Sequence, residues 1–270
     1  MLNRNNNFFR CKEENQDFLM KVLPILYKKG FYEFLHTKLF PSLLTYNREK
    51  NYVKFKEANT LSNIGDNNYS EIYHLLKSIQ NPTKEESLEI TTMLISNFKR
   101  SSINQKNIDK EALLNTIITC IKHYKEAYEE TNNYYPAINL VYMLKLLEIL
   151  FPKEKVFLDY NLENIYNSIQ LSIREDKRRG EDFNYYSSIS DIEFQILLSK
   201  YSNHQELKDE IANLLLELTP DKFLLERTVK QMLWFISLIE EFNEELNSSK
   251  RLVETIDIAV EELENQIYSL

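Results

Sequence analysis

Hydrophobic residues recur at steps of three and four along almost the whole chain, the spacing of α-helices with one apolar face. The pattern predicts about ten helices joined by short connections, so neighbouring helices should pack antiparallel. The predicted helices cover residues 15–28, 31–46, 70–80, 84–100, 109–130, 157–176, 182–200, 204–218, 221–243 and 248–268, with a further helix that has Pro136 in its first turn and ends before Pro152.

Several helix ends carry residues that are typical of caps. Thr83 and Glu86 have the spacing of a capping box, and Asp109 precedes another apolar periodic run. Pro24 and Pro41 lie within predicted helices, where a proline kinks or ends the helix.

Residues 47–68 form the longest stretch without helical periodicity, and they end in the turn-rich run 63–68. We therefore expect a boundary here. The predicted parts are a basic, aromatic-rich N-terminal helical segment (1–68), a helical-repeat region (69–243) and a C-terminal amphipathic helix (244–270).

The composition favours long helices over sheets. The 270 residues include only 3 glycines and 6 prolines, whereas tight turns and phosphate-binding loops require glycine. Each helix has one apolar and one charged face, a pattern that stacked helical hairpins satisfy. The predicted fold class is all-α, with tetratricopeptide-repeat-like (TPR-like) hairpins stacked in an α-α superhelix.

The last predicted helix has an apolar stripe and a strongly acidic opposite face. At the end of an array, such a helix is expected to be a solubilising cap. If its apolar stripe is exposed instead, the helix would serve a homodimer or another partner. The stripe consists of Leu252, Ile256, Ala259, Val260, Leu263 and Ile267.

Charge is distributed unevenly along the chain, whose formal net charge is −8. Residues 1–60 carry 11 Lys/Arg against 6 Asp/Glu, and residues 61–270 carry 22 against 35. The basic segment could bind an acidic partner or complement the chain's own acidic body. No apolar run approaches the ~18 residues of a membrane span, so we expect a cytoplasmic protein.

The chemistry-bearing residues form no recognisable catalytic or metal motif. The histidines have no second His or Cys at metal-site spacing, and the two cysteines lie far apart, so we expect reduced thiols. We predict no enzyme activity, no cofactor and no metal. The residues concerned are His36, His74, His123, His204, Cys11 and Cys120.

One tight basic cluster consists of Arg174, Lys177, Arg178 and Arg179, before Gly180. It is a candidate anion-binding site. Cations are also favoured at a helix C-terminus by the helix dipole, which explains the cluster without a ligand. We do not expect nucleic acid to bind, because a phosphate track requires many more such contacts.

Residues 120–128 resemble the second helix of a tetratricopeptide repeat. Cys120, Tyr124 and Ala127 provide the small residue, the aromatic residue and the alanine at the spacing of that helix.

Residues 133–139 (NYYPAIN) resemble the YYxGIN signature of the TRAFs-binding family, the TPR-like region of the apoptosis signal-regulating kinases and of many bacterial proteins. Residues 86–100 and 182–193 resemble its flanking motifs, so the resemblance extends over about residues 80–243. Ala137 and Glu89 replace glycines of the pattern, Tyr186 replaces its tryptophan, and Ser188-Ile189 replaces its alanine–threonine.

The resemblance implies scaffolding and protein recognition. We predict a scaffold or adaptor whose groove holds a partner protein or peptide. The alternative is a regulatory or sensor module of a bacterial defence or signalling system, acting on an effector enzyme or nucleic acid. The signature tyrosines could fill crevices between hairpins or contact the partner, and Asn139 is expected to bond a backbone group. The candidate partner-binding residues are Tyr134, Tyr135, Asn139, Tyr185 and Tyr186.

Overall fold

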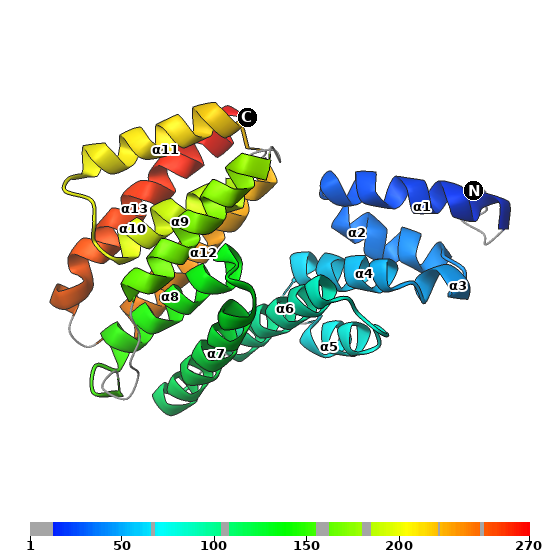
Figure 1. Ribbon diagram of the computed structural model, residues 1–270, viewed down its shortest axis with the longest axis horizontal. Helices are drawn as coiled ribbons and strands as arrows, with labels where there is room; N and C mark the ends of the chain where they lie inside the picture. The colour runs from blue at the N-terminus through cyan, green and yellow to red at the C-terminus, as the bar shows by residue number, and fades with distance from the viewer. Residues whose placement is uncertain are drawn as a thin grey trace, which may run out of the picture. The chain divides into compact units, whose positions relative to one another are not determined.

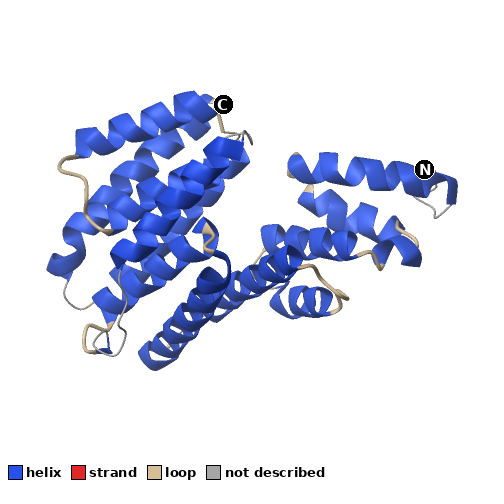
Figure 2. Ribbon diagram, in the orientation of Figure 1, coloured by secondary structure: helices blue, strands red, loops and turns tan. Residues whose placement is uncertain are grey.

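The computed structural model describes residues 13–65, 68–103, 108–154, 162–179, 185–220, 222–243 and 246–270. All regular secondary structure in these ranges is helical (Figure 2). The fold is the all-α, helical-repeat type that the sequence predicts. None of the helices described is both long and apolar enough to span a bilayer.

Contacts divide the chain into two compact units, Met1–Ile108 (unit 1) and Asp109–Leu270 (unit 2). This grouping does not test the predicted division at residues 68 and 243, which stays a prediction. The helices of unit 1 are α1 (Glu13–Lys28), α2 (Tyr32–Phe34), η2 (Leu35–Leu39), η3 (Phe40–Ser42), α3 (Thr45–Arg48), α4 (Asn51–Ile64), α5 (Tyr69–Lys77) and α6 (Lys84–Ile103).

The single helix predicted over residues 31–46 is wrong, because the chain passes there through a π-helix (η2) and a 3₁₀ turn (η3) before α3. Pro41 lacks the N–H that would continue the α-helical ladder. The Ser42 hydroxyl donates to the Lys38 carbonyl instead (2.7 Å), and Leu43 is extended. Pro24, by contrast, lies inside α1 without ending it.

The irregular stretch predicted over residues 47–68 is also wrong, since most of it forms α4. The buried face of this helix mixes Val53 and Leu61 with Lys54, Glu57 and Thr60. Polar side chains can be buried there because they have partners. The mixed composition removes the apolar periodicity by which a helix is recognised.

Unit 2 is built around α8, which contacts α7, α9, α10 and α12. Its buried side chains are almost all apolar. Figure 1 shows α8 among these helices. The helices of unit 2 are α7 (Lys110–Thr131), α8 (Tyr134–Leu150), α9 (Leu162–Arg179), α10 (Tyr185–Leu197), α11 (His204–Leu218), α12 (Lys222–Phe242) and α13 (Leu246–Ser269).

Successive helices of unit 2 alternate in direction. Between α9 and α10, Gln170 donates a hydrogen bond to Asp191. The ring centroids of Tyr166 and Phe194 lie 5.0 Å apart. Residue numbers therefore rise along one helix as they fall along the other, so the two helices are antiparallel. In Figure 1, α8, α10 and α12 run in one direction, and α9, α11 and α13 run in the opposite direction. The short connections of the repeat pattern produce this alternation.

The predicted caps are confirmed. Thr83 and Glu86 exchange two hydrogen bonds, of 2.8 and 3.1 Å, at the start of α6. The Asp109 carboxylate accepts from the Ala112 N–H (2.7 Å) at the start of α7. The left-handed Asn132 ends α7.

The apolar stripe of α13 is buried except for Ile267, which is half-buried. α13 packs on α11 and α12. The stripe is therefore covered within unit 2. The capping role and dimerisation through this helix both stay predictions.

Candidate functional site

A buried hydrogen bond fixes the register between α8 and α10. The Tyr142 hydroxyl donates to the Glu193 carboxylate at 2.8 Å, and both side chains are at least 95% buried. Burial, followed by the Glu193 charge, raises the pKa of Tyr142 well above its usual value. The Phe235 ring of α12 meets the Tyr142 ring edge-on at 5.2 Å.

This register brings the two predicted tyrosine pairs to the same end of unit 2. Tyr134 lies eight residues before Tyr142, and Tyr185 lies eight residues before Glu193. Eight residues of helix span about 12 Å. Because α8 and α10 run in the same direction (Figure 1), Tyr134–Tyr135 and Tyr185–Tyr186 lie at matching levels. We call this part of unit 2 the tyrosine end.

Two of the five predicted partner-binding residues are buried in the packing. Asn139 is 1% exposed and donates from Nδ2 to the Tyr135 carbonyl (3.0 Å), the backbone bond expected from the sequence. Tyr185 is 4% exposed and donates to the Thr228 hydroxyl on α12 (3.2 Å); burial raises its pKa. Tyr135 is 36% exposed, and Tyr134 and Tyr186 are half-buried.

Cationic residues lie at the same end. The Arg227 guanidinium is 5.9 Å from the Tyr186 ring centroid and 5.6 Å from that of Phe223. Arg174 is exposed on the last part of α9, which ends where α10 begins. The predicted basic cluster continues into the last turn of α9 with Lys177, Arg178 and Arg179, whose side chains lie outside the described residues.

A second polar cluster links α9, α10 and α11, and sequence reasoning missed it. Asp191 accepts from Gln170, and Glu210 accepts from the Tyr201 hydroxyl (2.8 Å) and the Gln195 amide (3.2 Å). These five residues and Tyr166 form the Asp191–Glu210 cluster. They are spread over 45 positions of the sequence without a short motif, so only the fold brings them together.

Burial is the main electrostatic effect in this cluster. It raises the pKa of the Asp191 carboxyl, and the neighbouring Glu210 charge raises it further. The pKa of Tyr201 is raised by burial and by its bond to Glu210. The Lys200 ammonium lies 3.5 Å from the Tyr166 ring centroid, in cation–π contact.

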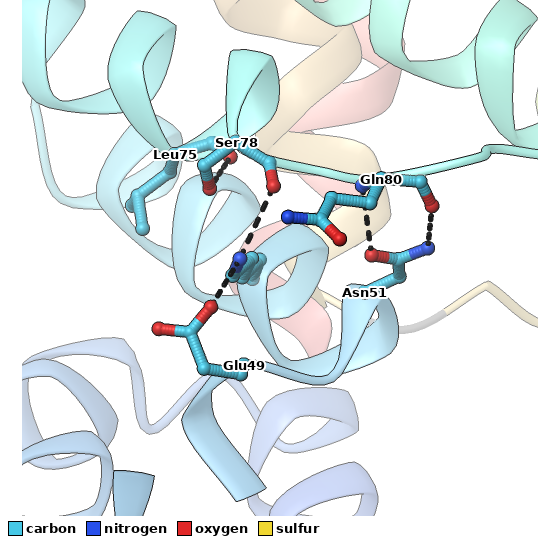
Figure 3. A network of polar contacts seen from close by, with 6 residues as sticks. Glu49, Asn51, Leu75, Ser78 and Gln80 are labelled. Atoms are coloured by element: carbon cyan, nitrogen blue, oxygen red, sulfur yellow. Dashed lines mark hydrogen bonds and ion pairs between the residues drawn. The ribbon is translucent and has the colours of Figure 1, made fainter. Parts of the chain in front are cut away.

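Unit 1 contains a polar network of structural character (Figure 3). The buried Lys54 ammonium donates to the Ser78 carbonyl (3.1 Å) and pairs with Glu49 (2.7 Å). Asn51 and Gln80 exchange two bonds between the Asn51 side chain and the Gln80 backbone. The network joins the start of α4 to the carbonyls that follow α5, where a cation also complements the helix dipole.

No group of three potential metal ligands occurs among the residues whose placement is described. Cys120 is buried on α7, and Cys11 lies outside the described residues. The four histidines lie on η2, α5, α7 and α11.

Residues 35–144 match the family model described as Tetratricopeptide Repeats-Sensor. The match covers less than half of the chain and supports its TPR-like character. No curated protein and no solved structure matches the chain. The finer resemblance to the TRAFs-binding family stays a prediction.

Proposed function

We propose that this protein is a non-enzymatic interaction module that binds a partner protein through the tyrosine end of unit 2. The observation that supports this most strongly is the alignment of Tyr134–Tyr135 with Tyr185–Tyr186 at matching levels of two parallel helices. The TPR-like match agrees with a binding role, since helical repeats bind partners on extended surfaces.

The chemistry of this end suits a protein interface. Tyrosine and arginine are enriched at such interfaces because they combine a large contact area with hydrogen-bonding groups. Tyr135 provides an exposed ring, and the buried Asn139 amide bonds the carbonyl of the same residue. The buried Tyr185 hydroxyl bonds Thr228 and so links α10 to α12. Binding therefore requires little rearrangement of this part of the protein.

A direct test is affinity purification of the tagged protein from the cells that produce it, using three forms. Tyr135→Glu places a charge on the proposed surface, where the start of α8 tolerates an acidic residue. Ile118→Glu is the matched control, because Ile118 is similarly exposed (41%) on α7. A thermal unfolding curve verifies that all three forms fold.

The proposal requires a protein that co-purifies with the unaltered chain and with Ile118→Glu but is lost with Tyr135→Glu. Recovery of the same proteins with all three forms would place binding elsewhere. Recovery of no specific protein with the unaltered chain would argue against an interaction module.

The second candidate function is a sensor or regulatory module, which the description of the matching family favours. The basic segment 1–60, with 11 aromatic residues, would then contact an effector enzyme or nucleic acid. The genes next to the coding sequence separate the two possibilities. A neighbouring nuclease, protease or cyclase supports the sensor, and housekeeping neighbours count against it.

A further inference from the structure

Two carboxylates of the Asp191–Glu210 cluster lie close enough for the Glu210 charge to act on Asp191. The Gln170 amide donates a hydrogen bond to Asp191, and the Gln195 amide and the Tyr201 hydroxyl donate to Glu210. Among the described residues, neither carboxylate has a cationic group within ion-pairing distance. Removing an ionised carboxylate from water is costly unless hydrogen bonds or a cation compensate it.

A cation is nevertheless bound beside them by an aromatic ring. The Lys200 ammonium sits 3.5 Å from the Tyr166 ring centroid, and its charge acts on Asp191. Lys200 belongs to the connection between α10 and α11 and is exposed, so its side chain can leave without moving a helix. The ring and the two carboxylates thus combine the two groups that recognise organic cations.

We propose that the Asp191–Glu210 cluster is a binding site for an organic cation, an alkylammonium or guanidinium group, and that Lys200 occupies part of this site until the ligand displaces it. The incoming group stacks on Tyr166 and pairs with Asp191 and Glu210. Its source is a free amine or an arginine or lysine side chain of a polypeptide. The inference does not depend on the tyrosine end, because Lys200 follows the opposite end of α10.

Displacement of Lys200 by a ligand distinguishes a binding site from a purely structural network, because the two predict different effects of removing Lys200. Removing the Lys200 ammonium vacates the ring, so Lys200→Met should bind an organic cation more tightly than the unaltered protein. A structural cation–π contact would produce the reverse, a loss of stability with no gain in binding. Lys222→Met, which removes an exposed lysine at the start of α12, is the matched control.

The test is isothermal titration of the full chain at low ionic strength with four probes. L-arginine and spermidine represent free amines. A blocked Gly-Arg-Gly peptide and its citrulline counterpart represent a polypeptide source with and without the charge. We expect a dissociation constant on the order of 1 mM for the better source, which corresponds to one well-placed charged group.

Lys200→Met should tighten binding about five- to tenfold, since a ligand no longer competes with an internal occupant. In the Lys200→Met background, Asp191→Asn or Glu210→Gln should weaken it at least tenfold, by loss of a charged partner. The two isosteric changes are made separately, so that a folding defect in one leaves the other informative. Stronger binding of the arginine peptide than of either free amine identifies a polypeptide ligand, and the reverse identifies a free amine.

The proposal is overturned if neither the unaltered protein nor Lys200→Met binds any cationic probe at concentrations up to about 10 mM. It is also overturned if Lys200→Met weakens binding, or if the citrulline peptide binds as well as the arginine peptide. The cation titration is independent of the tyrosine end, so a loss of partner binding by Tyr135→Glu would not change its outcome.

Discussion

The α4 helix of unit 1 and the α7 helix of unit 2 bury side chains of different kinds. α4 buries Lys54, Glu57 and Thr60 beside its apolar residues, and side-chain hydrogen bonds tie it to the end of α5. α7 buries a continuous stripe that includes Ile117 and Tyr124. Apolar side chains can pack in several relative orientations, whereas hydrogen bonds require one geometry of donor and acceptor. α4 thus depends on polar partners where α7 depends on packed volume.

The largest effect should come from removing volume in unit 2. Tyr142→Ala deletes a ring that is 1% exposed and leaves the buried Glu193 without its hydroxyl donor. We expect a loss of about 3–5 kcal/mol in the free energy of unfolding, measured by denaturant titration. Tyr268→Ala is the control, because that ring is 83% exposed. A small effect of Tyr142→Ala would mean that packing around α8 does not stabilise unit 2.

In unit 1, an equivalent test removes hydrogen bonds rather than volume. The Gln16 side chain is 1% exposed and bonds the Ser42 carbonyl (3.1 Å), the Leu44 N–H (2.9 Å) and the Asn47 amide (3.0 Å). Gln16→Ala leaves these groups unsatisfied, at a cost of about 2–3 kcal/mol.

The loss of stability in Gln16→Ala is measured by urea unfolding, and separately by hydrogen exchange of the unit 1 amides. Gln205→Ala, an exposed glutamine on α11, is the control and should change stability by less than about 0.5 kcal/mol. Equal effects of the two changes would contradict the polar account of unit 1.

A smaller effect is expected at the network drawn in Figure 3. Lys54→Met keeps the aliphatic stem but removes the ammonium that bonds the Ser78 carbonyl and Glu49. We expect a loss of about 1–2 kcal/mol by thermal unfolding. Lys50→Met, at an exposed lysine, should have almost no effect. A stabilising Lys54→Met would show that burying this charge costs more than its bonds return.

The smallest effect should be a gain rather than a loss of stability, and it concerns the Asp191 carboxyl in unit 2. Burial and Glu210 raise the pKa of Asp191 above its ordinary value of 3.8, so the folded protein binds this proton more tightly than the unfolded chain. Stability therefore falls as the pH rises from 3.8 through the raised pKa, and the ionised carboxylate is destabilising at neutral pH.

Asp191→Asn should accordingly stabilise the protein near neutral pH, by less than ~1 kcal/mol because solvent screens the site. The difference from the unaltered chain should shrink as the pH falls below 3.8. Unfolding curves across this range test the sign, with Asp209→Asn on the exposed face of α11 as the control. Destabilisation at neutral pH would make the carboxylate a structural group, like the polar groups of unit 1.

The same contrast explains what the sequence can and cannot predict. The α11 helix, with its Asn203 cap, starts and ends where its apolar spacing predicts, and the Thr83–Glu86 capping box is present. α4 could not be recognised, because its buried polar residues become compatible with a helix only when distant partners are in place.

The candidate sites show a similar limit. Motif resemblance selected Tyr134–Tyr135 and Tyr185–Tyr186, but it could not distinguish the exposed Tyr135 from the buried Tyr185. Burial depends on the register that the Tyr142–Glu193 bond fixes across 51 residues. The Asp191–Glu210 cluster has no local signature and is visible only after α9, α10 and α11 are assembled.

The most direct test of the proposed binding role is site-specific photo-crosslinking in the producing cells. A photoreactive phenylalanine analogue replaces Tyr135 at the tyrosine end in one form and Ile118 on α7 in the other. The account predicts a discrete crosslinked protein at position 135 that is absent at position 118. The same crosslinked protein at both positions, or at position 118 alone, would contradict binding at the tyrosine end.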